Sequence, residues 1–170
     1  WVRDGTTKLM ARLRAEIEAG NPQPDVLLIA DTVTLEGMAQ EGLLGAYQSP
    51  EAASYDAALH SPEGYYYSTK LITTGLVYNI GAETVPTSWS DLANASIRGQ
   101  IAMPSPLYSG AALIHLATLT GDASLGWEYY EGLAANEARA QGGNGGTFKA
   151  VASGEKPYGM VVDFLAIRNK

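Results

Sequence analysis

Residues 100–119 read QIAMPSPLYSGAALIHLATL, and this stretch decides the fold class. Residues 100–103 are apolar and have the length of a strand, whereas residues 111–119 are long and apolar enough for a buried helix. The loop between them ends in Ser109-Gly110, where a helix is expected to begin. A strand, a loop and a helix in this order predict an α/β protein. The Ser109 hydroxyl and the first free N–H groups of the helix could then bind one anionic group.

Upstream of this stretch the order is helix, strand, helix. Residues 7–19 have the periodicity of an amphipathic helix, and Thr6 or Thr7 is expected to cap it. Residues 25–30 are apolar without alternation, as in a strand covered on both faces. Asp31-Thr32 follows this strand and begins a second helix, so both side chains lie at the sheet edge where open α/β folds bind ligands.

The remaining chain divides into short elements. Residues 47–64 predict a long loop, and the aromatic and β-branched residues at 65–67 and 71–79 predict two strands. Glycines at 142–146 form a turn that allows close approach of the backbone to a ligand, with Thr147 opening a short helix after it. Further elements are expected at residues 87–92 (short helix), 126–136 (helix) and 158–162 (strand).

Composition and charge exclude several classes of protein. The 170 residues are 46% hydrophobic and include no cysteine, so the chain can form a core but has no disulfide or thiolate metal site. The net charge of -7 disfavours binding to nucleic acids and to anionic lipid surfaces. The apolar runs fall short of the roughly 18–20 residues that span a bilayer.

The motifs that carry catalysis or metal binding are weak. Neither nucleotide-binding glycine fingerprint is present. Ser109 and His115 stand six residues apart without the sequence of a nucleophile elbow, so a hydrolase triad is disfavoured and His115 is expected to pack in the core. His60, Glu63 and the tyrosines at 65–67 have the ligand types that ferric ion prefers, but a plain loop and strand explains them better.

Taken in order along the chain, several segments resemble the type 2 extracellular solute-binding proteins of ABC importers, in the branch of ferric-ion, phosphonate and sugar-phosphate binders. The segments follow the order found in that family and cover nearly the whole chain. They are GTTKLMARL (5–13), PDVLLIA (24–30), EGLL (41–44), TGLVYN (74–79), PTSWSDL (86–92), IRGQIAMP (97–104), Ser109-Gly110 and Gly154-Glu155.

The resemblance implies a type 2 periplasmic-binding-protein-like α/β fold of two lobes joined by crossover strands at a hinge. Residues 1–78 would form a partial first lobe that includes the hinge strand, and residues 79–170 the second lobe with the start of the return crossover. The chain lacks the family's opening strand and long C-terminal return, so a fragment with an incomplete first lobe is implied. The start at Trp1 suggests a processed or engineered terminus. Exposed sheet edges would favour a homo-oligomer.

The resemblance also implies a transport function. The ferric branch places a tyrosine pair after the strand at 158–162, where this chain has Phe164-Leu165. That branch also places a glutamate after the first-lobe strand, near Ala30-Asp31, where this chain has at best an aspartate. Ser109-Gly110-Ala111 matches the anion-binding helix start of the family. The expected ligand is therefore a small anionic solute, a phosphonate or a phosphate ester. The protein would bind this solute without catalysis, cofactor or metal and deliver it to an ABC permease in the inner membrane. It would be periplasmic or extracellular, either free or membrane-anchored.

The expected site draws on both lobes. Asp31 or Asp163 would accept an amine or hydroxyl group of the ligand. The alternative functions for the chain are a ferric-ion binder with tyrosines supplied elsewhere, a hydrolase or transferase, and a binder of a polyamine, sugar or other solute. The expected ligand-binding residues are Thr6, Thr7, Asp31 and Thr32 in the first lobe and Ser109, Gly110, Ala111, Asn144, Thr147 and Asp163 in the second.

Overall fold

A computed structural model describes residues 1–169, and the chain divides into two compact units. The first unit contains residues 1–30 together with the chain from Ile72 onward, and the second contains residues 31–71. This division differs from the expected lobes, residues 1–78 and 79–170, whose boundary stays a prediction. Each unit is described by itself below.

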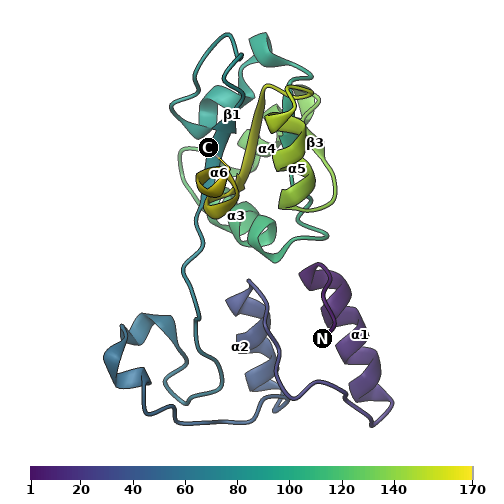
Figure 1. The fold of residues 1–170 in the computed structure, drawn as a ribbon, viewed down its shortest axis with the longest axis vertical. Helices are drawn as coiled ribbons and strands as arrows, with labels where there is room; N and C mark the ends of the chain where they lie inside the picture. Colours follow the sequence, from purple (N-terminus) through teal and green to yellow (C-terminus); the bar gives the residue numbers. More distant parts are fainter. Residues whose placement is uncertain (170) are drawn as a thin grey trace. The chain divides into compact units, whose positions relative to one another are not determined.

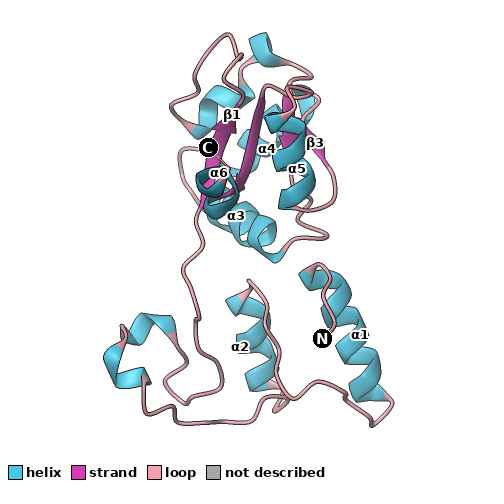
Figure 2. Ribbon diagram, viewed as in Figure 1, coloured by secondary structure: helices cyan, strands magenta, loops and turns pink. Residues whose placement is uncertain are grey.

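The first unit is built on one four-stranded mixed sheet with the strand order β1-β4-β2-β3 (Figures 1 and 2). The central strand β4 pairs antiparallel with β1 and parallel with β2, which in turn pairs parallel with β3. All five residues of β4 are buried, as expected for a strand covered on both faces. The strands are β1 (Thr74–Tyr78), β2 (Ile101–Met103), β3 (Arg139–Ala140) and β4 (Tyr158–Val162).

Helices cover both faces of this sheet. On one face, Tyr158 and Met160 of β4 share a core with residues of β2, α3 (Gly110–Thr120) and α4 (Gly126–Ala135). On the other face α5 (Asn144–Ala152) packs so closely that a Cβ at Gly159 would lie 2.9 Å from Val151 Cγ2. The short helices are η3 (Trp89–Ala93), η4 (Ala95–Ile97) and α6 (Asp163–Arg168).

The core on the α3 and α4 face is aliphatic with two tyrosines. Leu92, Ile101 and Leu133 are almost fully buried, and each contributes roughly 2 kcal/mol by the removal of its side chain from water. The cluster consists of Leu92, Ile97, Ile101, Met103, Leu119, Tyr129, Leu133, Tyr158 and Met160.

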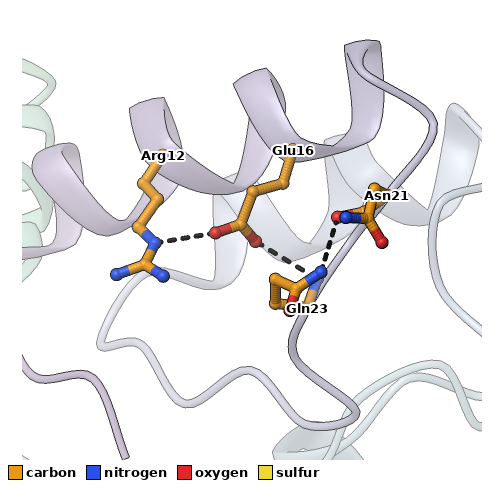
Figure 3. A network of polar contacts seen from close by, with 4 residues as sticks. All are labelled: Arg12, Glu16, Asn21 and Gln23. Atoms are coloured by element: carbon orange, nitrogen blue, oxygen red, sulfur yellow. Dashed lines mark hydrogen bonds and ion pairs between the residues drawn. The ribbon is translucent and has the colours of Figure 1, made fainter.

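Helix α1 (Thr6–Glu18) buries Met10 and Leu13 and is stabilised at its C-terminal end by polar contacts. Arg12 Nε donates to Glu16 Oε1 at 2.7 Å, and the Gln23 backbone N–H donates to Glu16 Oε2 at 3.2 Å (Figure 3). The bond from the Arg12 guanidinium lowers the pKa of Glu16. These bonds connect the helix to the chain that follows it.

The second unit consists of helix α2 (Thr32–Gln40) and a tightly bonded loop with two short helices, η1 (Ala52–Ser54) and η2 (Ala57–Leu59). His60 and Tyr67 form one antiparallel bridge and stack their rings with centroids 5.5 Å apart. The Tyr67 hydroxyl donates to the Tyr47 carbonyl at 2.6 Å. The aromatic residues of this loop therefore have a structural role.

Several predicted elements need correction. Residues 25–30 are not a strand, and Val26 and Leu28 are exposed, because no strand of residues 1–169 pairs with them. Residues 65–67 contribute one bridge and no strand. Gly5 caps α1 without a side-chain bond, so neither Thr6 nor Thr7 does. Helix α5 begins at Asn144, three residues before the expected start at Thr147, because helical geometry extends through Gly145-Gly146.

The other predicted elements are confirmed within one to three residues, as are the Asp31 cap and the end of the second helix before Gly42. Among residues 1–169, no helix has the length and apolar character needed to cross a membrane.

His115 is half-buried and packs against aromatic residues beside the core. Its ring lies edge-on to Trp89 with centroids 4.6 Å apart, and its Nδ1 is 3.1 Å from the Tyr130 hydroxyl. Burial lowers the pKa of His115 to about 4. The residue is therefore neutral at pH 7.

This burial predicts a loss of stability in acid. The unfolded chain binds a proton at His115 near pH 6.5 and the folded chain only near pH 4, so the free energy of unfolding falls as the pH drops through this range. The side chain is half-buried, so the loss is about 1–2 kcal/mol after solvent screening. Urea unfolding at pH 7 and pH 4.5 should show that wild type loses this much more stability than His115→Gln. Equal losses would contradict the assignment.

Candidate anion-binding site

The starts of three helices of the first unit meet around one loop. Ser109, the N-cap of α3, directly follows Tyr108, whose hydroxyl donates to Asp4 Oδ1 at 3.1 Å just before α1. A Cβ at Gly5 would lie 2.6 Å from the Tyr108 carbonyl oxygen, and one at Gly143 would lie 3.1 Å from the Tyr108 ring. The N-caps of α1 and α5 therefore both contact Tyr108.

Ser109 is fixed by bonds from two sides. Its Oγ accepts from the backbone N–H of Ala112 at 3.3 Å and from Asn144 Nδ2 at 3.1 Å. Asn144 Oδ1 in turn accepts from the backbone N–H of Val162, at the end of β4, at 3.0 Å. One amide thus connects the starts of α3 and α5 to the end of the central strand.

Free backbone donors lie beside the serine. The first N–H groups of a helix have no acceptor within it, and in α3 these belong to Gly110 and Ala111, since those of Ala112 and Leu113 bond to Ser109. Gly110 is buried, and a Cβ there would lie 2.7 Å from Thr6 Oγ1. The Thr6 hydroxyl therefore lies against the start of α3.

Helix dipoles give this region positive character, and the nearby lysine is paired with a carboxylate. Each helix start carries a partial positive charge. Lys8 Nζ lies 5.8 Å from the Tyr108 ring centroid and 3.7 Å from Asp4 Oδ2. The pKa of Asp4 is lowered, mainly by the Gly5 N–H and further by Tyr108 and Lys8, so its carboxylate is charged and locally paired.

The structure brings half of the predicted site residues together and places the others elsewhere. The structure brings Thr6, Ser109, Gly110, Ala111 and Asn144 together at the helix starts. Thr147 is buried in α5, and its Cγ2 would lie 3.3 Å from a Cβ at Gly159. Asp163 accepts from the Thr73 hydroxyl at 2.9 Å, beside the end of β4. Thr7 is exposed on α1.

Asp31 and Thr32 lie in the second unit. Asp31 is buried, and its Oδ1 accepts from the backbone N–H groups of Val33 and Thr34 while its Oδ2 accepts from the Thr34 hydroxyl. Both carboxylate oxygens are engaged in capping α2. Among residues 1–169, no group of three His, Asp or Glu side chains is placed to hold a metal ion.

Sequence reasoning placed Asp4 at a helix start but missed Tyr108 as a residue of this site. Tyr108 stands next to Ser109 in the loop, and the two glycines that its ring contacts, Gly5 and Gly143, each precede a helix. A glycine at the N-cap of two helices was a usable signal, because it allows an aromatic ring to approach the backbone. Their meeting at one ring depends on tertiary packing.

The sequence model of the bacterial extracellular solute-binding proteins matches residues 21–169. The chain belongs to this family. A relative is the probable ABC transporter periplasmic-binding protein y4fP of Sinorhizobium fredii, with 27% identity over 152 residues. The match covers 81% of this solute-binding chain and 42% of the relative.

Solved structures share its fold. Iron-bound HitA from Pseudomonas aeruginosa is 25% identical with a TM-score of 0.78 and is matched over 99% of this solute-binding chain and 55% of its own. The periplasmic binding protein AfuA from Actinobacillus pleuropneumoniae, with fructose-6-phosphate bound, is 23% identical with a TM-score of 0.75. The match covers 95% of this solute-binding chain and 54% of AfuA. The predicted periplasmic-binding-protein fold is confirmed, and the chain spans about half the length of these proteins.

The contact at Tyr108 predicts a clear effect of one methyl group. Gly5→Ala would push a Cβ into the Tyr108 backbone, which cannot rotate away, so we expect a loss of about 1–3 kcal/mol in the free energy of unfolding. Gly145→Ala is the matched control, since a Cβ there meets no atom within 4 Å, and it should raise stability by about 0.5–1 kcal/mol. Urea unfolding measures both. A Gly5→Ala variant as stable as wild type would contradict the packing.

Proposed function

We propose that this chain binds a small anionic solute, a phosphonate or phosphate ester, as part of the solute-binding component of an ABC importer. The observation that carries the proposal is the group of hydrogen-bond donors at the start of α3. The Ser109 hydroxyl and the N–H groups of Gly110 and Ala111 lie together there, with the Thr6 hydroxyl beside Gly110. Such donors bind oxyanions without a full positive charge.

The strength of such a site comes from its local donors. A hydrogen bond to an ionised group contributes about 1.5–3 kcal/mol, so three or four of them support tight binding of one phosphate group. The net charge of the chain is -7, which opposes the approach of an anion over long distances. Affinity therefore depends on the alignment of the donors at the helix starts.

The same contacts favour binding over catalysis. A serine nucleophile needs a base that accepts its proton, but both groups bonded to Ser109 Oγ are N–H donors. His115 bonds to the Tyr130 hydroxyl through Nδ1 and packs against Trp89. We therefore assign no enzymatic step and no cofactor to this chain.

Family membership supports the rest of the proposal. As in an importer of this kind, the whole protein would work in the periplasm or at the cell exterior, free or membrane-anchored, and deliver its solute to a permease. Residues 1–78 and 79–170 would belong to different lobes. Closure of the lobes would bring Thr7, Asp31 and Thr32 to the ligand, with Thr147 and Asp163 on the other side.

Binding of ferric ion is the second candidate, because HitA was solved with iron bound. Iron prefers phenolate oxygen, yet burial raises the pKa of Tyr129, and a bond to Glu36 raises that of Tyr66. Phe164 and Leu165, where the ferric branch places its tyrosine pair, are the second and third residues of α6 after β4. Iron binding would therefore rely on tyrosines other than these, as in a ferric-ion binder whose tyrosines are supplied elsewhere.

Calorimetric titration and thermal unfolding test the anionic solute. Inorganic phosphate, methylphosphonate and fructose 6-phosphate are the probes, and at least one should raise the melting temperature. Ser109→Ala should weaken the binding of that probe roughly 10- to 100-fold, because it removes a charge-assisted bond. Ser96→Ala, a matched change at an exposed serine of η4, should leave the affinity unchanged.

Two results would overturn this proposal. One is the absence of binding by all three probes to a cooperatively folding full-length protein. The other is equal affinity of wild type and Ser109→Ala. A visible charge-transfer band after addition of ferric ion, without binding of the anions, would favour the iron alternative.

A further inference from the structure

The first turn of α5 contains a pair of residues that is prone to spontaneous chemical change. Of the asparagines in the sequence, only Asn144 is followed by a glycine, and Gly145 is exposed. Glycine has no Cβ, so nothing on Gly145 shields its nitrogen from the side chain before it. Among residues 1–169, no acceptor is assigned to the Gly145 N–H, as expected in the first turn of a helix. This nitrogen is therefore free to react.

The reaction of an Asn-Gly pair is deamidation through a cyclic intermediate. The Gly145 nitrogen loses its proton and bonds to Asn144 Cγ, while the Cγ–Nδ2 bond breaks and the amide nitrogen leaves as ammonia. The resulting succinimide takes up one water molecule, which opens the ring to an aspartate or an isoaspartate. The ring closes only after the Asn144 backbone has left its helical ψ, because the helical angle holds Cγ away from the next nitrogen.

Two hydrogen bonds of the Asn144 side chain oppose this reaction. Oδ1 accepts from the Val162 N–H at 3.0 Å, and Nδ2 donates to Ser109 Oγ at 3.1 Å. Ring closure must break both bonds. Since the net effect of one hydrogen bond is up to roughly tenfold on such an equilibrium, folding should slow deamidation about 10- to 100-fold.

The glycines of the same turn act in the opposite direction. Gly145 and Gly146 both lie inside α5, where glycine is less favourable than alanine. The turn is closed by the N–H groups of Gly146 and Thr147, which share the Gly143 carbonyl at 3.1 and 3.3 Å. A turn with so few bonds opens far more often than the whole unit unfolds. Fraying of this turn therefore gives the Asn144 side chain access to the reactive geometry.

We propose that Asn144 is a deamidation site of the folded protein and that fraying of the first turn of α5 sets the rate of the reaction. The reaction requires no ligand and is independent of the proposed transport function. Its product has a carboxylate in place of the amide, which has no N–H to donate to Ser109. Isoaspartate also lengthens the main chain, so the bond to Val162 and the start of the helix no longer fit together.

Peptide mapping by mass spectrometry measures the reaction. Full-length protein is incubated at about pH 9, folded and in urea, and each asparagine peptide is followed by the mass increase that accompanies the loss of ammonia and the uptake of water. We expect conversion at Asn144 in both states, about 10- to 100-fold slower in the folded protein. Asn79 and Asn136 precede isoleucine and glutamate, whose side chains obstruct the attack, so they should remain unchanged over the same period.

Gly146→Ala tests whether fraying sets the rate. The variant keeps the Asn-Gly pair, and its Cβ meets no atom within 4 Å, but alanine favours the helix. Conversion should become about three- to fivefold slower in the folded protein and stay unchanged in urea. Gly145→Ala is the matched change that removes the Asn-Gly pair, and it should slow the reaction in both states.

Ser109→Ala tests the restraint from the side chain. It removes one of the two bonds that hold the Asn144 amide, so conversion in the folded protein should become about three- to tenfold faster. Ser96→Ala, at an exposed serine of η4, should leave the rate unchanged. Because Gly146→Ala introduces no close contact, the test of fraying stands even if Ser109→Ala fails to fold.

Each outcome decides the proposal. Faster conversion of another asparagine in the folded protein overturns the site. The absence of conversion at Asn144 after about a hundred half-lives of the unfolded reaction also overturns it. An unchanged folded-state rate in Gly146→Ala overturns fraying as the cause. A slower folded-state rate in Gly146→Ala, with the rate in urea unchanged, supports the proposal.

Discussion

The burial of β4 between β1 and β2 is the constraint on which the rest of the first unit depends. A strand buried on both faces must satisfy every backbone group, and the last N–H, that of Val162, does so through Asn144. This bond sets the start of α5, and Asn144 in turn sets the Ser109 side chain at the start of α3. The pairing of the sheet thereby determines the geometry of the candidate site.

At the proposed site, a chain with a net charge of -7 would bind an anion through local hydrogen-bond donors. Helix starts concentrate N–H donors in a small volume, and their effect falls off within a turn, whereas the net charge acts over the whole surface. Thr6, Gly110 and Ser109 provide the donors, and Tyr108 keeps the helix starts in contact. Under this proposal, anion affinity would depend on hydrogen-bond geometry more than on the net charge.

The sequence predicted the elements that their own apolar pattern defines and missed the relations that depend on distant segments. Helix α3 was predicted from its apolar pattern and its capping serine, and strand β4 from its apolar pattern alone. Residues 25–30 have the composition of a buried strand but no strand to pair with in residues 1–169, so they form no strand and are largely exposed. The Ser109 and Asn144 pair was expected in one site, but the role of Val162 depends on a register that composition does not encode.

A crystal structure of the full-length protein with fructose 6-phosphate would test the anion site most directly. We expect a phosphate oxygen within hydrogen-bond distance of Ser109 Oγ and of the Gly110 N–H, with Asn144 Nδ2 still bonded to Ser109. A phosphate group bound away from the start of α3 would contradict the assignment of the site.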